Sequence, residues 1–238
     1  DPQWLEAHDA AVTVVTYGPQ GRLFSGGDDF AIYRWDDGTP VQVGRHQGKV
    51  AGLAVSPDGR WLASGSWDGS VVLWPLDDAG EGQALPYPGA GVNDIAFAAD
   101  GGALYAATSA GELLVYDPNT RDTPRPLVKH GFGINKITVG PEWIAYGAVD
   151  GGTRVIDLAG AQIADFTLDR RPVLAMDYHA ETGQIAVGDG HGYFMMLDAA
   201  RWRITHDYRA TRRGPVWALA FSRDGQTIHA GGLDDVAY

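Results

Sequence analysis

Hydrophobic and polar residues alternate at strand period in three consecutive runs between His46 and Trp74. Val50, Leu53 and Val55 lie in the first run, Trp61–Ser66 form the second, and Val71–Trp74 form the third. Tight turns separate the runs, and the Asp58-Gly59 pair is a strong hairpin signal because glycine adopts positive φ without steric cost. The pattern predicts three antiparallel strands, a unit too small to bury its faces alone.

The same unit recurs along the whole chain. Its first apolar position returns every 38 to 43 residues, at Val12, Val50, Val92, Ile134, Val173 and Val216. A repeat of about 40 residues with four strand-length segments, a leading His and a closing Trp resembles the WD40 repeat. The resemblance implies an all-β WD40 β-propeller with six recognisable four-stranded antiparallel blades, and we expect one domain over residues 1–238.

The two ends of the chain lie within the repeat pattern. Residues 3–5 read as the outer strand of the last blade, and residues 236–238 fall where the third strand of that blade should continue. We therefore expect the sequence to be a fragment, or the processed part of a longer protein. One further blade outside it would make seven. The loop-like stretch 77–88 leaves room for an outer strand at Gln83–Leu85.

Composition narrows the function classes. The net charge of −12 argues against binding nucleic acid or an anionic membrane surface, both of which favour a basic face. The chain has no cysteine, so it has no disulfide, no thiolate metal site and no covalent haem attachment of its own. No apolar run approaches the length that crosses a membrane, so we expect no membrane insertion.

Two repeats carry His, Ser, Asp and Trp at matching positions. These residues are His8, Ser25, Asp29 and Trp35 in the first repeat, and His46, Ser64, Asp68 and Trp74 in the second. The resemblance implies a structural tetrad in which buried polar groups satisfy one another, rather than a catalytic triad. Repeats three to six are degenerate at these positions. Ala106 and Ala110 replace the Ser and Asp in repeat three, and Val187 and His191 replace them in repeat five.

Two sets of residues are candidates for partner binding. Basic residues concentrate in the loops that lead into the first strand of each repeat, and four of them form the predicted docking patch: Arg170, Arg171, Arg212 and Arg213. The patch would suit an anionic partner surface; the alternative is that these are ordinary solvated loops. The second set lies beside the first strand or the turn Asp, at Asn93, Asn135, Trp217 and Trp67. Exposed tryptophans suit an interaction hot spot, whereas packing between blades is the alternative.

No catalytic or metal-binding constellation stands out. The seven histidines lack HxxxH or HExxH spacing, and the glycine-rich stretch 188–192 lies at a strand turn with no helix after it to bind phosphate. We therefore predict neither an enzyme nor a metal site. A propeller enzyme with a cofactor in its channel is the less favoured interpretation.

Four segments resemble a narrower family. They begin at His130, Tyr146, Leu168 and Arg212 and are similar to the propeller part of bacterial WD40 proteins that carry a C-terminal cytochrome c domain. This resemblance implies a periplasmic protein of electron transfer, with haem c in a module outside this chain. The alternative is a generic WD40 scaffold without haem, which could equally be cytoplasmic. In either case we expect a protein partner.

Overall fold

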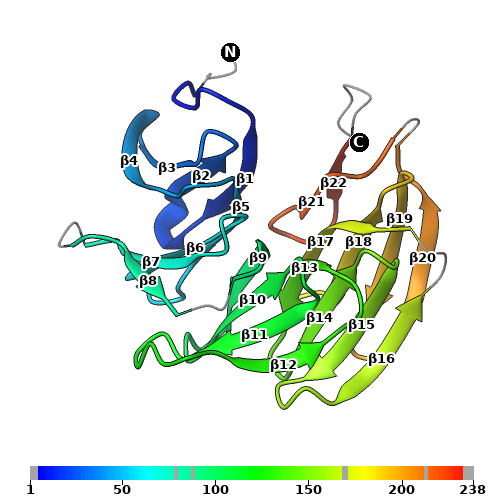
Figure 1. Ribbon diagram of the computed structural model, residues 1–238. Helices are drawn as coiled ribbons and strands as arrows, with labels where there is room; N and C mark the ends of the chain where they lie inside the picture. Colours follow the sequence, from blue (N-terminus) through cyan, green and yellow to red (C-terminus); the bar gives the residue numbers. More distant parts are fainter. Residues whose placement is uncertain (1–4, 78–79, 87–88, 168–170, 212–213, 233–238) are drawn as a thin grey trace. The chain divides into compact units, whose positions relative to one another are not determined.

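Antiparallel β-meanders make up nearly all the regular structure of the computed structural model (Figure 1). The structure describes every residue except 1–4, 78–79, 87–88, 168–170, 212–213 and 233–238. Contacts group the chain into two compact units, Asp1–Lys129 and His130–Tyr238. In the described residues no helix is long and apolar enough to cross a membrane.

Unit 1 contains three four-stranded sheets, each with its strands in chain order. The first sheet consists of β1 (Val12–Tyr17), β2 (Leu23–Gly27), β3 (Ala31–Asp36) and β4 (Thr39–Arg45). A single 3-10 turn, η1 (Pro19–Gly21), joins β1 to β2. The second sheet consists of β5 (Val50–Val55), β6 (Trp61–Ser66), β7 (Val71–Pro75) and β8 (Gln83–Leu85). The third consists of β9 (Val92–Phe97), β10 (Leu104–Thr108), β11 (Glu112–Tyr116) and β12 (Arg125–Lys129).

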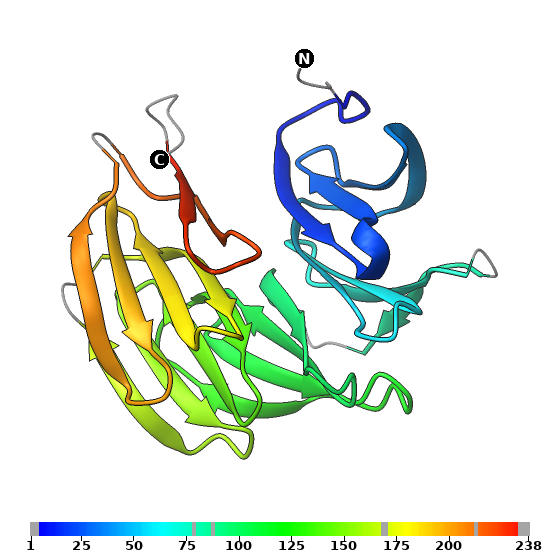
Figure 2. The same ribbon diagram turned by 180° about the vertical axis from the view of Figure 1, so that it is seen from behind.

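Unit 2 contains two four-stranded sheets and a pair of strands, which stand side by side in both views (Figures 1 and 2). The fourth sheet consists of β13 (Ile134–Val139), β14 (Trp143–Ala148), β15 (Gly152–Asp157) and β16 (Gln162–Thr167). The fifth consists of β17 (Val173–His179), β18 (Gln184–Asp189), β19 (Tyr193–Asp198) and β20 (Arg203–Arg209). The sixth sheet, as far as the structure describes it, is β21 (Ala218–Phe221) with β22 (Ile228–Gly231).

Neighbouring sheets within a unit stack by placing a valine over a glycine. The first residue of β5, Val50, is fully buried, and an added Cβ on Gly26 in β2 would lie 2.6 Å from its Cγ1 atom. In unit 2, Val173 packs in the same way on Gly147 of β14, where an added Cβ would lie 2.3 Å from Cγ1. A side chain on these glycines would therefore hold the sheets apart, which explains the recurring glycine of the second strand.

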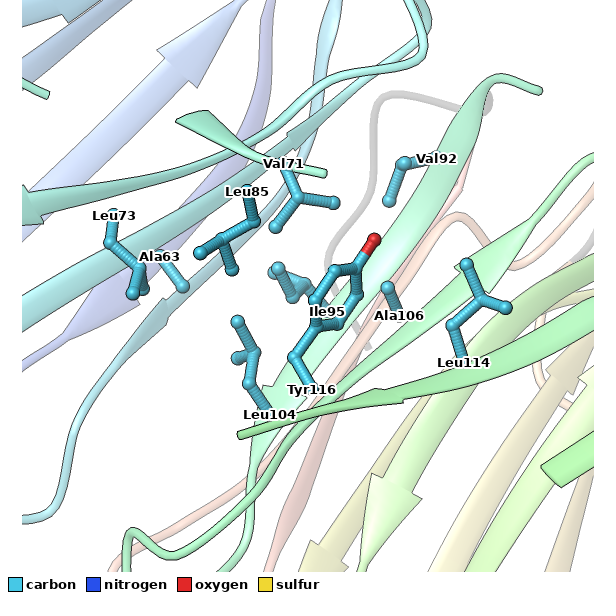
Figure 3. Close-up of a cluster of buried hydrophobic side chains, with 10 residues drawn as sticks. All are labelled: Ala63, Val71, Leu73, Leu85, Val92, Ile95, Leu104, Ala106, Leu114 and Tyr116. Carbon is cyan, nitrogen blue, oxygen red and sulfur yellow. The ribbon is translucent and has the colours of Figure 1, made fainter. Parts of the chain in front are cut away.

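Apolar side chains from facing sheets fill the space between them. Between the second and third sheets Val92 and Ile95 of β9 pack with Leu73, Leu85 and Leu104 (Figure 3). Ala106 and Tyr116 belong to the same buried cluster. Because every second residue of a strand points to one face, the period-2 pattern of the sequence supplies this packing.

The structure confirms the all-β class and the antiparallel meanders expected of WD40 β-propeller blades. The outer strand predicted at Gln83–Leu85 is β8. Six sheets occur, but only five have four strands, because the expected outer and third strands of the last blade fall largely on residues 1–4 and 233–238, outside the described residues. Leu5, the expected last residue of that outer strand, is not in a strand. The single domain over residues 1–238 stays a prediction.

Candidate interaction surface and its supporting network

The first sheet brings its four predicted tetrad residues together. The Nδ1 atom of His8 lies 2.9 Å from a carboxylate oxygen of Asp29, and its Nε2 atom lies 2.8 Å from the Ser25 hydroxyl. The indole N–H of Trp35 donates to the same Ser25 oxygen at 2.8 Å. If His8 carries its proton on Nδ1, Ser25 accepts from Trp35 and donates to His8, so each buried polar group is satisfied. Hydrogen bonds from His8 and from two backbone amides, those of Asp9 and Ala31, outweigh burial and lower the pKa of Asp29.

The second sheet builds the same chain with an added member. Ser64 lies 2.7 Å from Nε2 of His46 and accepts from the Trp74 indole at 2.8 Å. On the other side of the ring, the Ser70 hydroxyl lies 2.7 Å from Nδ1 and donates to Asp68, which is itself 3.4 Å from His46. The sequence reasoning missed Ser70. The one feature of the sequence that could have indicated it is a hydroxyl residue two places after the turn Asp.

Burial sets the titration of this second network. Desolvation lowers the pKa of the His46 imidazole, and the nearby Asp68 carboxylate only partly opposes that effect. Burial alone would raise the pKa of Asp68, but hydrogen bonds from the side chain of Ser70 and the backbone of Gln47 outweigh it, so the pKa of Asp68 is lowered. His46 is therefore held neutral beside an ionised Asp68 at neutral pH.

In the third to fifth sheets, other residues occupy the positions of the tetrad. In the third and fifth sheets the serine position is taken by Ala106 and Val187, both buried in apolar clusters. In the fourth sheet the buried Tyr146 takes the serine position. The turn residue Asp150 accepts from Arg154 at 3.2 and 2.9 Å, and Arg154 also donates to Asp165 at 3.2 Å. The imidazole of His130 lies 3.5 Å from Asp150. The sequence reasoning did not find this network, although an Asp at the turn followed four residues later by an Arg is a signal for it.

Trp67 is a large aromatic side chain held in place on the surface. Its side chain is 58% exposed on the turn between β6 and β7. Its backbone N–H donates to the carbonyl of Lys49 at 3.0 Å. The Lys49 ammonium lies 4.7 Å from the centre of the Trp67 ring and 3.7 Å from Asp28. The cation–π contact and the ion pair restrict the ring without covering it.

The other three residues of this predicted set fall in different environments. Trp217 is 52% exposed in unit 2. The Asn135 side-chain amide donates to the Val173 carbonyl at 2.9 Å, which ties the fourth sheet to the fifth. Asn93 lies half-buried in β9. Both tryptophans are thus exposed rather than packed between sheets, while Asn135 has a structural contact. Their part in partner binding stays a prediction.

The structure describes only one of the four arginines of the predicted basic patch. Arg170, Arg212 and Arg213 lie outside the described residues. The Arg171 guanidinium lies 4.3 Å from the centre of the Tyr193 ring and 3.4 Å from Asp189. Three other basic residues near the ends of repeats, Arg45, Lys129 and Arg209, are the last residues of the outer strands β4, β12 and β20 rather than loop residues.

Comparison with known proteins identifies the repeat. The family model of the WD domain, G-beta repeat, matches residues 3–36, 38–75 and 202–238. The chain contains WD40 repeats. Two of the matched stretches cover the sheets with complete tetrads.

Several relatives are similar to this chain over part of their length. The chain is 26% identical over 184 residues to WD repeat-containing protein 90 of Xenopus tropicalis, covering 76% of this chain and 10% of that protein. It is 32% identical over 113 residues to Periodic tryptophan protein 2 homolog of Schizosaccharomyces pombe, covering 43% of this chain and 13% of that protein. It is 31% identical over 100 residues to Small ribosomal subunit protein RACK1 of the same yeast, covering 42% and 31%. The chain therefore spans less than a third of each of these relatives.

Proposed function

We propose that this chain is a non-catalytic scaffold that binds a protein partner through the surface around Trp67. WD40 repeats support an interaction role. The observation that carries the proposal is that Trp67 is exposed and yet held by Lys49, which itself pairs with Asp28. Buried aromatic anchors dominate binding energy at interfaces, and an aromatic side chain that is already ordered loses less entropy when it is covered.

The tetrads support a scaffold rather than a hydrolase. Ser25 and Ser64 are buried, and each hydroxyl is engaged by a Trp and a His. A serine nucleophile needs an exposed oxygen beside an oxyanion hole. Among the described residues there is also no group of three or more His, Cys, Asp or Glu side chains that could hold a metal ion. The chemistry of these sites therefore favours a structural role.

Substitution of the exposed tryptophan tests the scaffold. The wild-type chain first retains its partner from an extract of the source cells, and mass spectrometry identifies that partner. The affinity of the purified partner is then measured for wild type, Trp67→Ala and, as a matched exposed aromatic, Tyr17→Ala. We expect Trp67→Ala to weaken binding at least about tenfold, as for a hot-spot residue, and Tyr17→Ala to leave it unchanged. Equal affinity of all three proteins would exclude the surface around Trp67.

A narrower function rests on sequence resemblance. We propose that this chain is the propeller part of a periplasmic c-type cytochrome protein and positions a haem module for electron transfer. Support comes from the segments that begin at His130, Tyr146, Leu168 and Arg212, with an acidic, cysteine-free propeller as an accompanying trait. The haem would belong to a module outside this chain, since the chain has no cysteine to attach it.

A visible absorption spectrum of the full-length protein, purified from its source, decides the narrower proposal. A Soret band with the α and β bands of a c-type cytochrome after reduction is the expected result. A featureless visible spectrum would exclude haem and leave a generic WD40 scaffold, whose compartment would then be read from fractionation of the source cells.

A further inference from the structure

Each sheet that stacks on another within a unit places its first-strand valine over the second-strand glycine of the sheet before it. Besides Val50 on Gly26 and Val173 on Gly147, the same contact joins Val216 to Gly188, where an added Cβ would lie 2.6 Å from the valine Cγ1. In these contacts a sheet turns its valine towards the sheet before it and its glycine towards the sheet after it. Sheets that lie one after another are therefore complementary in shape.

One valine and one glycine of this kind are uncovered. Val12 begins β1 as Val50 begins β5, yet its side chain is 52% exposed. Gly231 of β22 follows the buried Ala230 as Gly188 follows Val187. Among the described residues, an added Cβ on Gly231 would meet only the Ala218 Cβ, at 3.9 Å. The first sheet thus presents a free valine, and the sixth sheet presents a free glycine.

The turn after the first strand adds a second feature to each contact. Between the first and second sheets, an added Cβ on Gly59 would lie 3.5 Å from the ring of Pro19, and both residues line a cavity of about 90 Å³ together with Leu76. Pro57 makes the same contact with Gly101 of the third sheet, at 3.6 Å. The second residue of one turn therefore sits against the turn glycine of the next sheet.

The equivalent turn residues on the two uncovered surfaces carry opposite charges. On the first sheet, Gly21 and Asp37 stand where the second sheet has Gly59 and Leu76. Both line a cavity of about 420 Å³, and among the described residues nothing lies within 4 Å of an added Cβ on Gly21. On the sixth sheet, the exposed Arg223 stands at the position of Pro19. The pattern of the other contacts would place Arg223 beside the exposed Asp37.

We propose that the sixth sheet of one copy of this chain binds the first sheet of a second copy, with Val12 over Gly231 and Arg223 beside Asp37. A second copy is the partner that the surfaces select, because it carries the valine for the glycine and the carboxylate for the guanidinium. The contact is heterologous, so it closes into a ring of copies or extends into a filament. This assembly is independent of the scaffold function assigned to the surface around Trp67.

Light scattering of the whole chain, measured over a wide range of protein concentration, tests the proposal. We expect the mass of the wild type to rise with concentration. Gly231→Leu fills the space that the valine needs, and Val12→Asp places a charge in an apolar contact, so each should weaken association at least about tenfold. Val41→Asp is the matched control, because Val41 is a 39% exposed valine of β4, outside both surfaces. Its association should equal that of the wild type.

A charge exchange tests the pairing of the two surfaces without filling either of them. Asp37→Lys and Arg223→Glu each bring like charges together, so each should weaken association about three- to tenfold at low salt. A mixture of the two variants restores an attractive pair between unlike copies, and it should associate more tightly than either variant alone. Circular dichroism checks that every variant is folded.

Three results would overturn the proposal. One is a wild-type mass of a single chain at every concentration, which would mean that a second copy does not cover these surfaces. Another is association that neither Gly231→Leu nor Val12→Asp weakens. The third is a mixture of the charge variants that associates no better than its components, which would show that the two surfaces do not meet.

Discussion

The first two sheets and the three that follow them fill the same buried positions with residues of different chemistry. In the first two, a buried serine accepts the indole N–H of the closing tryptophan and contacts a histidine at 2.7 to 2.8 Å. In the third, the corresponding pair is Ala106 with Tyr116, and in the fifth it is Val187 with Leu197. In the fourth sheet the pair is Tyr146 with Ile156, and the turn residue Asp150 forms an ion pair with Arg154.

The difference shows that the repeat needs a buried side chain of suitable volume at the serine position more than it needs a particular hydrogen-bond network. Apolar packing needs only matching volume, whereas a polar network needs every member because an unpaired buried group is costly. The family model matches residues 3–36 and 38–75, which carry the network, and also residues 202–238, where Ala230 takes the place of the serine. The sheet architecture, like the match to the repeat, therefore persists without the network.

The largest expected effect is the loss of the shared serine. Ser64→Ala leaves both the Trp74 indole and His46 without a partner in a buried site, so we expect the free energy of unfolding to fall by about 2 to 4 kcal/mol. Urea unfolding checks this. In the third sheet, Ala106→Ser is the reciprocal change. Because its buried neighbours are apolar apart from the Tyr116 hydroxyl, the new hydroxyl should destabilise by about 1 to 3 kcal/mol rather than restore a network. A stabilising Ala106→Ser would show that the sheets are interchangeable after all.

Two valines occupy the same repeat position in the first and second sheets but differ in burial. Val50 in β5 is fully buried, whereas Val12 in β1 is 52% exposed in the structure. We expect Val50→Ala to cost about 2 kcal/mol of unfolding free energy and Val12→Ala to cost less than about 0.5 kcal/mol. The two variants share the same chemical change, so each is the control for the other. An equal cost, measured by urea unfolding, would mean that Val12 is covered in solution.

Much of the fold follows from local signals in the sequence. The second strand predicted at Trp61–Ser66 is β6 with the same bounds, because alternating apolar residues and an Asp-Gly turn fix both its register and its start. In that turn Asp58 accepts from the Ser56 hydroxyl at 2.6 Å and from the Arg60 amide at 3.0 Å, and these bonds lower its pKa to about 2. Such contacts span only a few residues, so a sequence pattern can report them.

The contacts of the candidate sites were harder to predict. Whether Trp67 is covered depends on the position of Lys49, and the Arg154 network depends on Asp165 from the neighbouring strand. Sequence spacing does not determine side-chain rotamers, so these contacts emerge only from the three-dimensional arrangement.

The valine-on-glycine contact is a device that both groups of sheets share, so it should respond equally in both. An added Cβ would lie 2.4 Å from Val92 Cγ1 at Gly65 and 2.3 Å from Val173 Cγ1 at Gly147. We expect Gly65→Ala and Gly147→Ala each to cost about 1 to 2 kcal/mol, since overpacking outweighs the entropy gained by replacing glycine. Gly231→Ala is the control, because among the described residues its Cβ would meet only the Ala218 Cβ, at 3.9 Å. Unequal costs in urea unfolding would show that the two groups of sheets differ in rigidity as well as in chemistry.

The smallest expected effect is a pH dependence confined to the network of the second sheet. Burial lowers the pKa of His46 in the folded chain below its ordinary value of 6.5, so the unfolded chain binds the proton more tightly than the folded one. The stability contributed by His46 is complete above pH 6.5 and is lost as the pH falls from there through the lower folded pKa. The loss is about 1.4 kcal/mol for each pH unit between the pKa of the unfolded chain and that of the folded chain. Asp29 and Asp68 titrate below their ordinary value of 3.8 and do not contribute in this range.

Urea unfolding at pH 7.5 and 5.5 should therefore show a loss of stability for wild type and a smaller one for His46→Gln, which cannot titrate. Hydrogen exchange of the Trp74 indole, which donates to Ser64, localises the effect to this sheet. An identical loss in both proteins would assign the pH dependence to other histidines.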